Sequence, residues 1–316
     1  MKLGLQINSF DWNGGPERFG KNLAEIGSVA EEAGFDRIGV ADHLWQHPIM
    51  GGPEANEPEC YTTLAFLAAN TDRIGLTAMV SGVHFRHPAV LVKSVTTLDV
   101  LSGGRAHFGV GSGHYEEETE GLGIPFPPQK ERFEMLEETL RISLRMWSGE
   151  RGDERPFEGK HYRLERPLNL PQSTRRPHPP IMVAGDGENK TLRLVARYAD
   201  ACSLRPGPEV PAKLDVLRRH CEDVGRDPAE ITKTRMATVY VAPTQEAAEA
   251  KFKAVAGDSE QARAQAFVGE PSEVARQTQA YLDAGLDGIT IVLPDAHDTE
   301  SVTLAGEALG AVIKRP

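Results

Sequence analysis

An acid and a histidine stand side by side in this sequence, at Asp42 and His43, directly after the apolar segment 36–41. Histidine exchanges a proton near neutral pH, and a neighbouring carboxylate can hold its tautomer and raise its basicity. The pair therefore indicates general acid–base chemistry. Two adjacent residues form a weak motif, and the other interpretation is that Asp42 caps the following turn while His43 is a satisfied polar residue.

A glycine-rich turn, Gly185–Glu188, separates a short apolar segment from a helical pattern. Backbone N–H groups at a helix amino end, together with the helix dipole, attract anions. This turn therefore predicts a phosphate-binding loop, with an ordinary strand-to-helix turn as the alternative. Asp186 and Glu188 would repel an anion unless they face away, and Lys190 or Arg205 could offset their charge.

A second glycine loop, Gly111–Gly113, follows the apolar segment 106–110 and would let the backbone come close to a bound group. His84 and His87 follow another apolar segment and stand three residues apart. They could bind a metal, but neither a carboxylate nor a third ligand lies near them in the sequence. We therefore favour lining of a pocket, or packing of a loop, for these two histidines.

What the sequence lacks narrows the classes of function. It has no Gly-x-Ser-x-Gly elbow, no dinucleotide fingerprint and no P-loop, which favours a cofactor that performs the difficult chemistry. The formal net charge of −11 argues against a nucleic-acid or anionic-membrane partner. No apolar run approaches the roughly 18 residues that span a bilayer. The cysteines show no metal-binding spacing.

The cellular setting follows from the cysteines and the first residues. Cys60, Cys202 and Cys221 are odd in number and widely spaced, which is simplest in a reducing compartment. The first apolar residues become polar too quickly for a signal peptide and suggest a strand instead. We therefore expect a cytoplasmic protein.

Short apolar strands alternate with helical patterns over almost the whole length. The predicted strands are residues 2–8, 36–41, 73–80, 106–110, 180–184, 199–204, 231–242 and 288–293. The predicted helices are 16–33, 61–70, one that starts at Pro88 and stops at Gly103, 130–147, 191–198, 210–224, 246–255, 272–284 and 302–314. Eight such strands favour an α/β fold of the (β/α)8 TIM-barrel type, formed by residues 1–316 as a single domain. The loops singled out above follow strands, at the end of the barrel where active sites lie.

Three segments do not fit the repeat, namely 114–129, 149–179 and 256–270. The first is a long loop with acids and prolines, and the third is polar. Within the second, residues 157–164 suggest a small hairpin, so we expect that segment to be ordered. Long insertions of this kind are usually functional or disordered.

Three stretches carry a resemblance to a known family. They are Ala33–His43, Pro88–Arg105 continuing into Gly109–Gly113, and Pro180–Glu188 continuing into Leu192–Asp200. With them the chain resembles the luciferase-like monooxygenase superfamily, and within it the branch that uses the deazaflavin coenzyme F420. The resemblance extends from about Leu3 to Ile291.

This resemblance implies a bacterial-luciferase-like barrel with insertion segments, a flavin-like ring at its mouth and a phosphate at the loop after strand 5. It implies catalytic roles for His43, Asp42 and Trp45, and a strand-3 bulge, often with a cis peptide, at Met79–Val80. The implied cofactor contacts are Asp42, Met79, Val80, Gly111, Ser112, Gly113, Glu117, Gly185, Asp186, Gly187, Glu188 and Ser203. Sugar-phosphate dehydrogenases of this branch carry an acid soon after the loop's last glycine. Here His114-Tyr115 stands there, and the acids 116–118 come later.

The expected function is hydride transfer between coenzyme F420 and a small organic substrate. In alcohol oxidation His43 would take the hydroxyl proton and Asp42 would orient it. The alternatives are an FMN-dependent monooxygenase and a non-catalytic flavin-binding barrel. We expect a homodimer, a flavin or F420 reductase as a further partner, and no metal.

Overall fold

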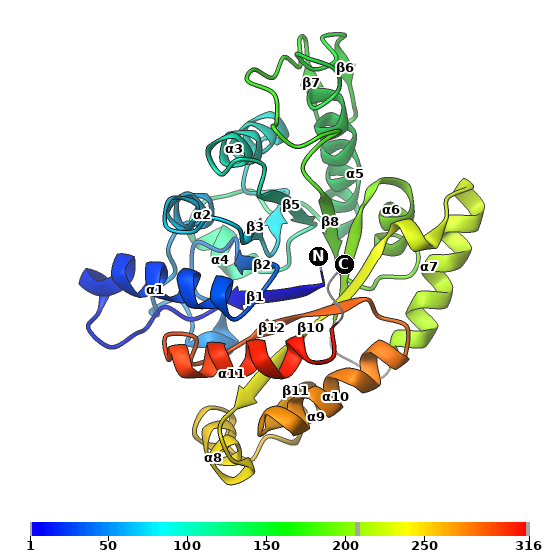
Figure 1. Cartoon of the computed structure of the whole chain (residues 1–316). Coiled ribbons are helices and arrows are strands. Elements are labelled where there is room, and N and C mark those ends of the chain that lie inside the picture. The colour runs from blue at the N-terminus through cyan, green and yellow to red at the C-terminus, as the bar shows by residue number, and fades with distance from the viewer. Residues whose placement is uncertain (1, 206–208, 314–316) are drawn as a thin grey trace.

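The strands close into a barrel. The computed structural model describes residues 2–205 and 209–313, and Figure 1 shows its strands with helices around them. Eight parallel strands follow one another in chain order, and the last pairs with the first. They are β1 (Leu3–Ile7), β2 (Arg37–Val40), β3 (Gly75–Ala78), β5 (Ala106–Gly111), β8 (Ile181–Ala184), β9 (Ala201–Leu204), β10 (Thr232–Val241) and β12 (Gly288–Val292). The predicted (β/α)8 TIM barrel is confirmed.

Helices cover the outside of this barrel. They are α1 (Phe19–Glu32), α2 (Cys60–Ala69), α3 (Pro88–Leu101), α5 (Gln129–Met146), α6 (Thr191–Tyr198), α7 (Val210–Val224), α8 (Gln245–Ala256), α10 (Pro271–Asp283) and α11 (Thr299–Gly310). α3 starts at Pro88 as predicted, and Gly103 beyond its end has a left-handed φ of 68°. The predicted end of the last helix, Lys314, lies outside the described residues. Of the helices described, none is long and apolar enough to cross a membrane.

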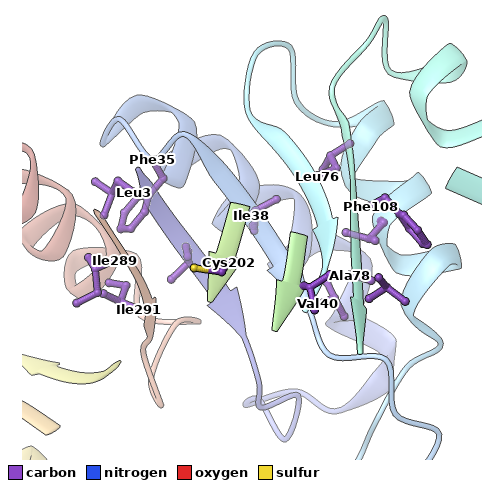
Figure 2. Packing of buried hydrophobic residues seen from close by; sticks show 14 of the residues in the cluster. Leu3, Phe35, Ile38, Val40, Leu76, Ala78, Phe108, Cys202, Ile289 and Ile291 are labelled. Carbon is purple, nitrogen blue, oxygen red and sulfur yellow. The ribbon is translucent and has the colours of Figure 1, made fainter. Parts of the chain in front are cut away.

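The main core lies between the strands and the helices. Successive side chains of a strand point to opposite faces, and Leu3 and Leu5 of β1 are buried in one cluster with Ile26 of α1. Figure 2 shows that Ile38 and Ile289, on the two strands that flank β1, belong to the same cluster. Burying one such side chain contributes about 1.5–3 kcal/mol, so this face of the strands holds the helices in place.

The inside of the barrel is polar where the strands begin. A Cβ added at Gly4 would lie 2.9 Å from Nε of Arg37. The Arg37 guanidinium on β2 donates a hydrogen bond of 2.5 Å past Gly4 of β1 to Oγ1 of Thr290 on β12. Burial lowers the pKa of Arg37 to about 10, which still leaves the side chain charged at neutral pH. The glycine at position 4 therefore leaves the space that this charged side chain fills.

Strand 3 is interrupted by a bulge. Thr77 pairs with His107 on β5, and the next pair joins the first residue of β4 (Ser81–Gly82) to Val110. Three residues on one strand thus face two on the other, which defines a β-bulge. The Met79–Val80 peptide inside it is cis. The bulge and its cis peptide lie where the resemblance implied them.

The predicted hairpin in segment 149–179 is present. β6 (Phe157–Glu158) pairs antiparallel with β7 (Arg163–Leu164). The buried carboxylate of Glu138 on α5 accepts hydrogen bonds from the consecutive backbone N–H groups of residues 160–162, at 2.6, 3.1 and 3.0 Å. One side chain thus anchors the turn of the hairpin to the helix below it.

The other two insertion segments hold regular elements that we did not predict. Segment 114–129 contains α4 (Glu116–Gly121), and segment 256–270 contains α9 (Glu260–Gln265) and β11 (Ala266–Gly269). β11 pairs with the last part of β10, which is the longest strand of the sheet. Each of these elements is too short to show a period in the sequence, so tertiary pairing decides it.

Removing the Glu138 carboxylate should release the hairpin. Glu138→Ala leaves three N–H groups without their acceptor. A hydrogen bond to a charged group contributes about 1.5–3 kcal/mol, but these N–H groups are only part-buried, so water replaces part of the lost bonding. We expect a loss of about 2–4 kcal/mol in the free energy of unfolding, measured by urea denaturation. Glu131→Ala, an exposed position on the same helix, is the control. Equal stability of the two variants would show that the anchor is dispensable.

Candidate active site

The histidine of the predicted pair has a carboxylate partner, but that partner is not Asp42. His43 follows β2, and its Nδ1 lies 2.9 Å from Oε2 of Glu118 on α4. Glu118 is fully buried, whereas the neighbouring Glu117 is exposed. The structure therefore corrects the expectation that Asp42 orients His43, because Glu118 does so. The resemblance had assigned Glu117 of this helix to the cofactor. The buried acid is instead the next residue, Glu118.

Three donors hold the Glu118 carboxylate. Its Oε1 accepts the backbone N–H groups of Leu44 and, at 3.0 Å, of Trp45, while Oε2 faces the His43 ring. Burial opposes ionisation, but these hydrogen bonds outweigh it and lower the pKa of Glu118. The ionised carboxylate favours a proton on Nδ1 of His43, which leaves Nε2 as the basic nitrogen. The pair is thus arranged for proton transfer at Nε2.

Asp42 instead forms a buried ion pair. Nη1 of Arg86 donates to both of its oxygens, at 2.9 and 2.7 Å. Nη2 of the same arginine contacts Glu59 at 2.6 Å, and Glu59 caps the start of α2. Burial raises the pKa of Asp42 and the arginine counteracts the rise. Asp42 therefore ties the end of β2 to the loop before α3 and to α2, a positioning role that the sequence did not suggest.

Uncharged rings surround His43. The ring centroids of His114, Tyr115 and His47 lie 5.5, 5.9 and 6.1 Å from that of His43. Desolvation, and then repulsion from His43 when its ring is protonated, lower the pKa of both His47 and His114, so these two rings are uncharged at neutral pH. The indole of Trp45, predicted to be catalytic, packs against the backbone of α4. Among these histidine rings, His43 is the one that contacts the buried carboxylate of Glu118.

Two glycines that we expected to line the cofactor make room for protein atoms. A Cβ at Gly111 would lie 2.9 Å from Cγ2 of Val80 in the bulge. A Cβ at Gly113, whose φ is 76°, would overlap the His84 ring. The carbonyl of Ser112 between them accepts a hydrogen bond of 3.1 Å from the side chain of Arg132. The loop 111–113 therefore packs against Val80 in the bulge and against the His84 ring.

The two histidines after strand 3 have separate surroundings. Both ring nitrogens of His84 are buried, with no hydrogen-bond partner among the described residues. Burial lowers the pKa of His84 to about 4. His87 caps α3, where its Nδ1 accepts the N–H of Ala89 at 3.2 Å. The described part of the chain contains no group of histidine, cysteine or acidic side chains suited to a metal ion.

The predicted phosphate loop leads into the amino end of α6, which no side chain caps. Gly185 has a φ of 114°, and its N–H donates to the carbonyl of Ser203 on β9 at 2.9 Å. A Cβ at Gly187 would lie 2.9 Å from Oγ1 of Thr191. Uncapped N–H groups and close glycine backbone suit an anion, so the residues present fit a phosphate here.

The acids of this loop are already paired. Oδ1 of Asp186 lies 2.8 Å from Nε of Arg205, and Oε1 of Glu188 lies 2.7 Å from Nζ of Lys213. The charge that would repel an anion is therefore compensated, by Arg205 as expected and by a lysine that we did not consider. The other expected cation, Lys190, lies over the ring of Phe133, 5.0 Å from its centroid.

Sequence reasoning missed the roles of Glu118 and Arg86. Glu118 belongs to a run of three glutamates in which only a helical turn distinguishes the inward residue. Arg86 lies between the two histidines after strand 3, where no motif singled it out. The usable signal for both was their place after strand ends, where functional side chains gather.

Comparison with known proteins places the chain among related sequences. The family model for luciferase-like monooxygenases matches residues 5–297. An F420-dependent glucose-6-phosphate dehydrogenase from Kineococcus radiotolerans is 29% identical, with 96% of this chain and 94% of that protein covered. A protein of the same name from Nakamurella multipartita is 30% identical, with 95% of each chain covered.

Solved structures share the fold. The coenzyme F420-dependent tetrahydromethanopterin reductase from Methanopyrus kandleri superposes with a TM-score of 0.80 over 99% of each chain. Its sequence is 17% identical to this one. At that level of identity the likeness shows a common barrel.

Glu118 should stabilise the fold in a pH-dependent way. Its pKa is lowered below the ordinary value of 4.5, so its contribution is present above pH 4.5 and is lost as the pH falls through the lowered value. We expect Glu118→Gln to lose about 1–3 kcal/mol of unfolding free energy at pH 7 and much less near pH 3. Thermal unfolding at both pH values measures this. Exposed Glu117→Gln is the control, and a deficit of Glu118→Gln that persists unchanged at pH 3 would contradict the assignment.

Proposed function

The chain belongs to the luciferase-like monooxygenase family, and on this premise we propose that it is an oxidoreductase that works with coenzyme F420 on a small organic substrate. Relatives that align over about 95% of the chain and are named F420-dependent dehydrogenases support the choice of cofactor. The observation that carries the proposal is the His43–Glu118 pair at the carboxyl end of β2. A small-molecule substrate and assembly as a homodimer are parts of the same proposal.

Two parts of the chain would hold the cofactor. The loop 185–188 and the uncapped amino end of α6 fit its phosphate. The bulge at Met79–Val80 lies on the strand next to β2, so it would support the ring system near His43. When bound, the deazaflavin supplies a carbon atom that accepts or releases a hydride. Ser203 lies beside the phosphate loop through its bond with Gly185.

The protein's own contribution is proton transfer. In alcohol oxidation, Nε2 of His43 accepts the hydroxyl proton while the hydride leaves the substrate carbon, and the alcohol becomes a carbonyl compound. Glu118 accepts a hydrogen bond from Nδ1–H of His43 throughout, and its negative charge stabilises the imidazolium that forms. In the reducing direction His43 returns the proton to the carbonyl oxygen. Both electrons leave or arrive with the hydride, so the protein side chains change only their protonation.

A cofactor titration tests this proposal directly. Purified protein is mixed with F420 or with FMN, and binding is followed by fluorescence. We expect F420 to bind, to be reduced in the presence of an alcohol substrate, and to consume no oxygen. Binding of FMN with oxygen consumption would instead show a flavin monooxygenase. Binding of either cofactor without turnover of any substrate would show a ligand-binding barrel.

Loss of the His43 ring should affect the reaction rather than cofactor binding. General acid–base catalysis typically contributes about 10²–10⁴-fold to a rate. We expect His43→Ala to lower turnover by that factor for any alcohol that the wild-type protein oxidises with F420, while the dissociation constant of F420 changes little. His87→Ala, which removes a helix cap and a ring contact with Tyr162 outside the proposed site, is the control. Unchanged turnover in His43→Ala would assign the ring a structural role.

Cofactor binding should depend on the glycine backbone of the phosphate loop. Gly187→Val places a branched side chain 2.9 Å from Thr191 Oγ1, where the backbone must approach the phosphate. We expect a far greater loss of F420 affinity in this variant than in Lys190→Ala, whose ammonium group lies over Phe133. Fluorescence titration measures both, with circular dichroism as the check on folding. Wild-type affinity in Gly187→Val would place the phosphate elsewhere.

A further inference from the structure

One acid at the barrel mouth has no hydrogen-bond partner among the described residues. Glu57 lies in the loop between β2 and α2, and both oxygens of its carboxyl group are buried without a hydrogen bond to any described residue. Native proteins satisfy the great majority of buried polar groups. Two covered oxygens on one ionisable side chain therefore mark a group whose partner comes from outside the chain. The mechanism above makes no use of this residue.

The loop fixes Glu57 from both sides. Before it, the side chain of Asn56 donates a hydrogen bond of 2.5 Å to Oδ1 of Asp11 in the loop after β1. After it, Glu59 accepts the N–H of Thr62 at 2.7 Å and contacts Arg86 at 2.6 Å. The backbone on either side of Glu57 is thus tied to neighbouring elements. Its inward position follows from these contacts and is not the chance orientation of a free loop.

The charges around Glu57 favour its protonated form. Burial, and then the negative charges of Glu118 and Asp42, raise its pKa to about 9. Burial raises the pKa of the nearby Cys60 thiol, so this group carries no charge at neutral pH. The nearby cation, Arg86, already pairs with Asp42 and Glu59. Glu57 therefore presents an O–H donor and a carbonyl acceptor at neutral pH.

An independent observation points to the same mouth. Gln6 on β1 is 3% exposed; its Nε2 lies 3.4 Å from the Met79 carbonyl in the bulge, and its Oε1 is buried without a partner. Oδ1 of Asn8, two residues further along, is also buried and unpartnered. Gln6 lies on β1, the strand that pairs with β2, and Asn8 directly follows the carboxyl end of β1. Near the carboxyl ends of β1 and β2, buried polar atoms thus lack a hydrogen-bond partner among the described residues, and a polar ligand would supply one.

We propose that Glu57 is a substrate-binding residue, which donates its proton in a hydrogen bond to an uncharged hydroxyl or carbonyl oxygen of the substrate. This inference rests on the proposed oxidoreductase function and specifies its substrate class. A phosphate or carboxylate facing Glu57 would add a further negative charge beside Glu118 and Asp42. The group of the substrate that faces Glu57 is therefore uncharged.

The protonation of Glu57 can be tested without cofactor or substrate. A raised pKa contributes stability that is fully present below the unfolded value of 4.5 and is lost as the pH rises towards 9. We expect Glu57→Gln to unfold at a higher temperature than wild type at pH 9, with the difference shrinking towards pH 5. Glu54→Gln, exposed in the same loop, should show no such trend. A Glu57→Gln difference independent of pH would show that Glu57 is ionised, which overturns the inference.

The contact with substrate is tested by turnover of a panel of uncharged ketones and alcohols and of glucose 6-phosphate, with F420 in the matching redox state. Loss of one hydrogen bond corresponds to about a tenfold effect. We expect Glu57→Ala to raise KM about tenfold for the uncharged substrates with a smaller change in kcat, and Glu57→Gln to recover most of the loss, because an amide is also a neutral donor. Equal KM values in wild type and Glu57→Ala for every substrate that is turned over would overturn the inference.

The two proposals fail in different ways. If no compound is turned over by any variant while F420 is not bound, the oxidoreductase function is wrong and the substrate role of Glu57 is wrong with it. If wild type turns over the panel but the KM pattern is absent, only the role of Glu57 is wrong.

Discussion

The pairing of β12 with β1 is the constraint on which the rest of this structure depends. Its register joins residues 3–6 to residues 289–292 and closes a sheet that would otherwise have two open edges. Closure brings the carboxyl ends of all eight strands around one mouth. Side chains that are far apart in the sequence, on loops after β2, β3, β5 and β8, can only then act together. The polar interior around Arg37 and the apolar shell outside it follow from the same closure.

Within the mouth, acids differ in what compensates their charge. Asp42 has Arg86, and Glu118 has the N–H groups of two residues and the ring of His43. Glu57 has neither cation nor donor within the described residues. Burial acts on all three, but the outcome depends on the partner, because hydrogen bonds and opposite charge favour ionisation while desolvation opposes it. One site thus holds an ionised orienting acid, an ion-paired structural acid and a neutral acid.

The bulge shows how one local feature dictates residue types at a distance. It adds one residue to strand 3 and directs Val80 towards β5, where glycine at position 111 leaves the room. Gly113 does the same for His84. The glycines of that loop are thus explained by neighbouring protein atoms, whereas those after β8 adjoin an uncapped helix end. Two glycine loops of similar appearance in the sequence therefore have different physical reasons.

The sequence by itself determined the barrel, the positions of its strands and the end at which chemistry occurs, because each strand is a short apolar run and eight of them alternate with helical patterns. It also singled out His43 and the glycine loop after β8 as candidates for the site and, through family resemblance, placed the bulge at Met79–Val80. Only the tertiary structure decided which acid orients His43. That acid, Glu118, lies 75 residues away on a six-residue helix that is too short to show a period. Adjacency in sequence suggested Asp42, but neighbouring side chains diverge, and Asp42 turns to Arg86 while His43 faces α4.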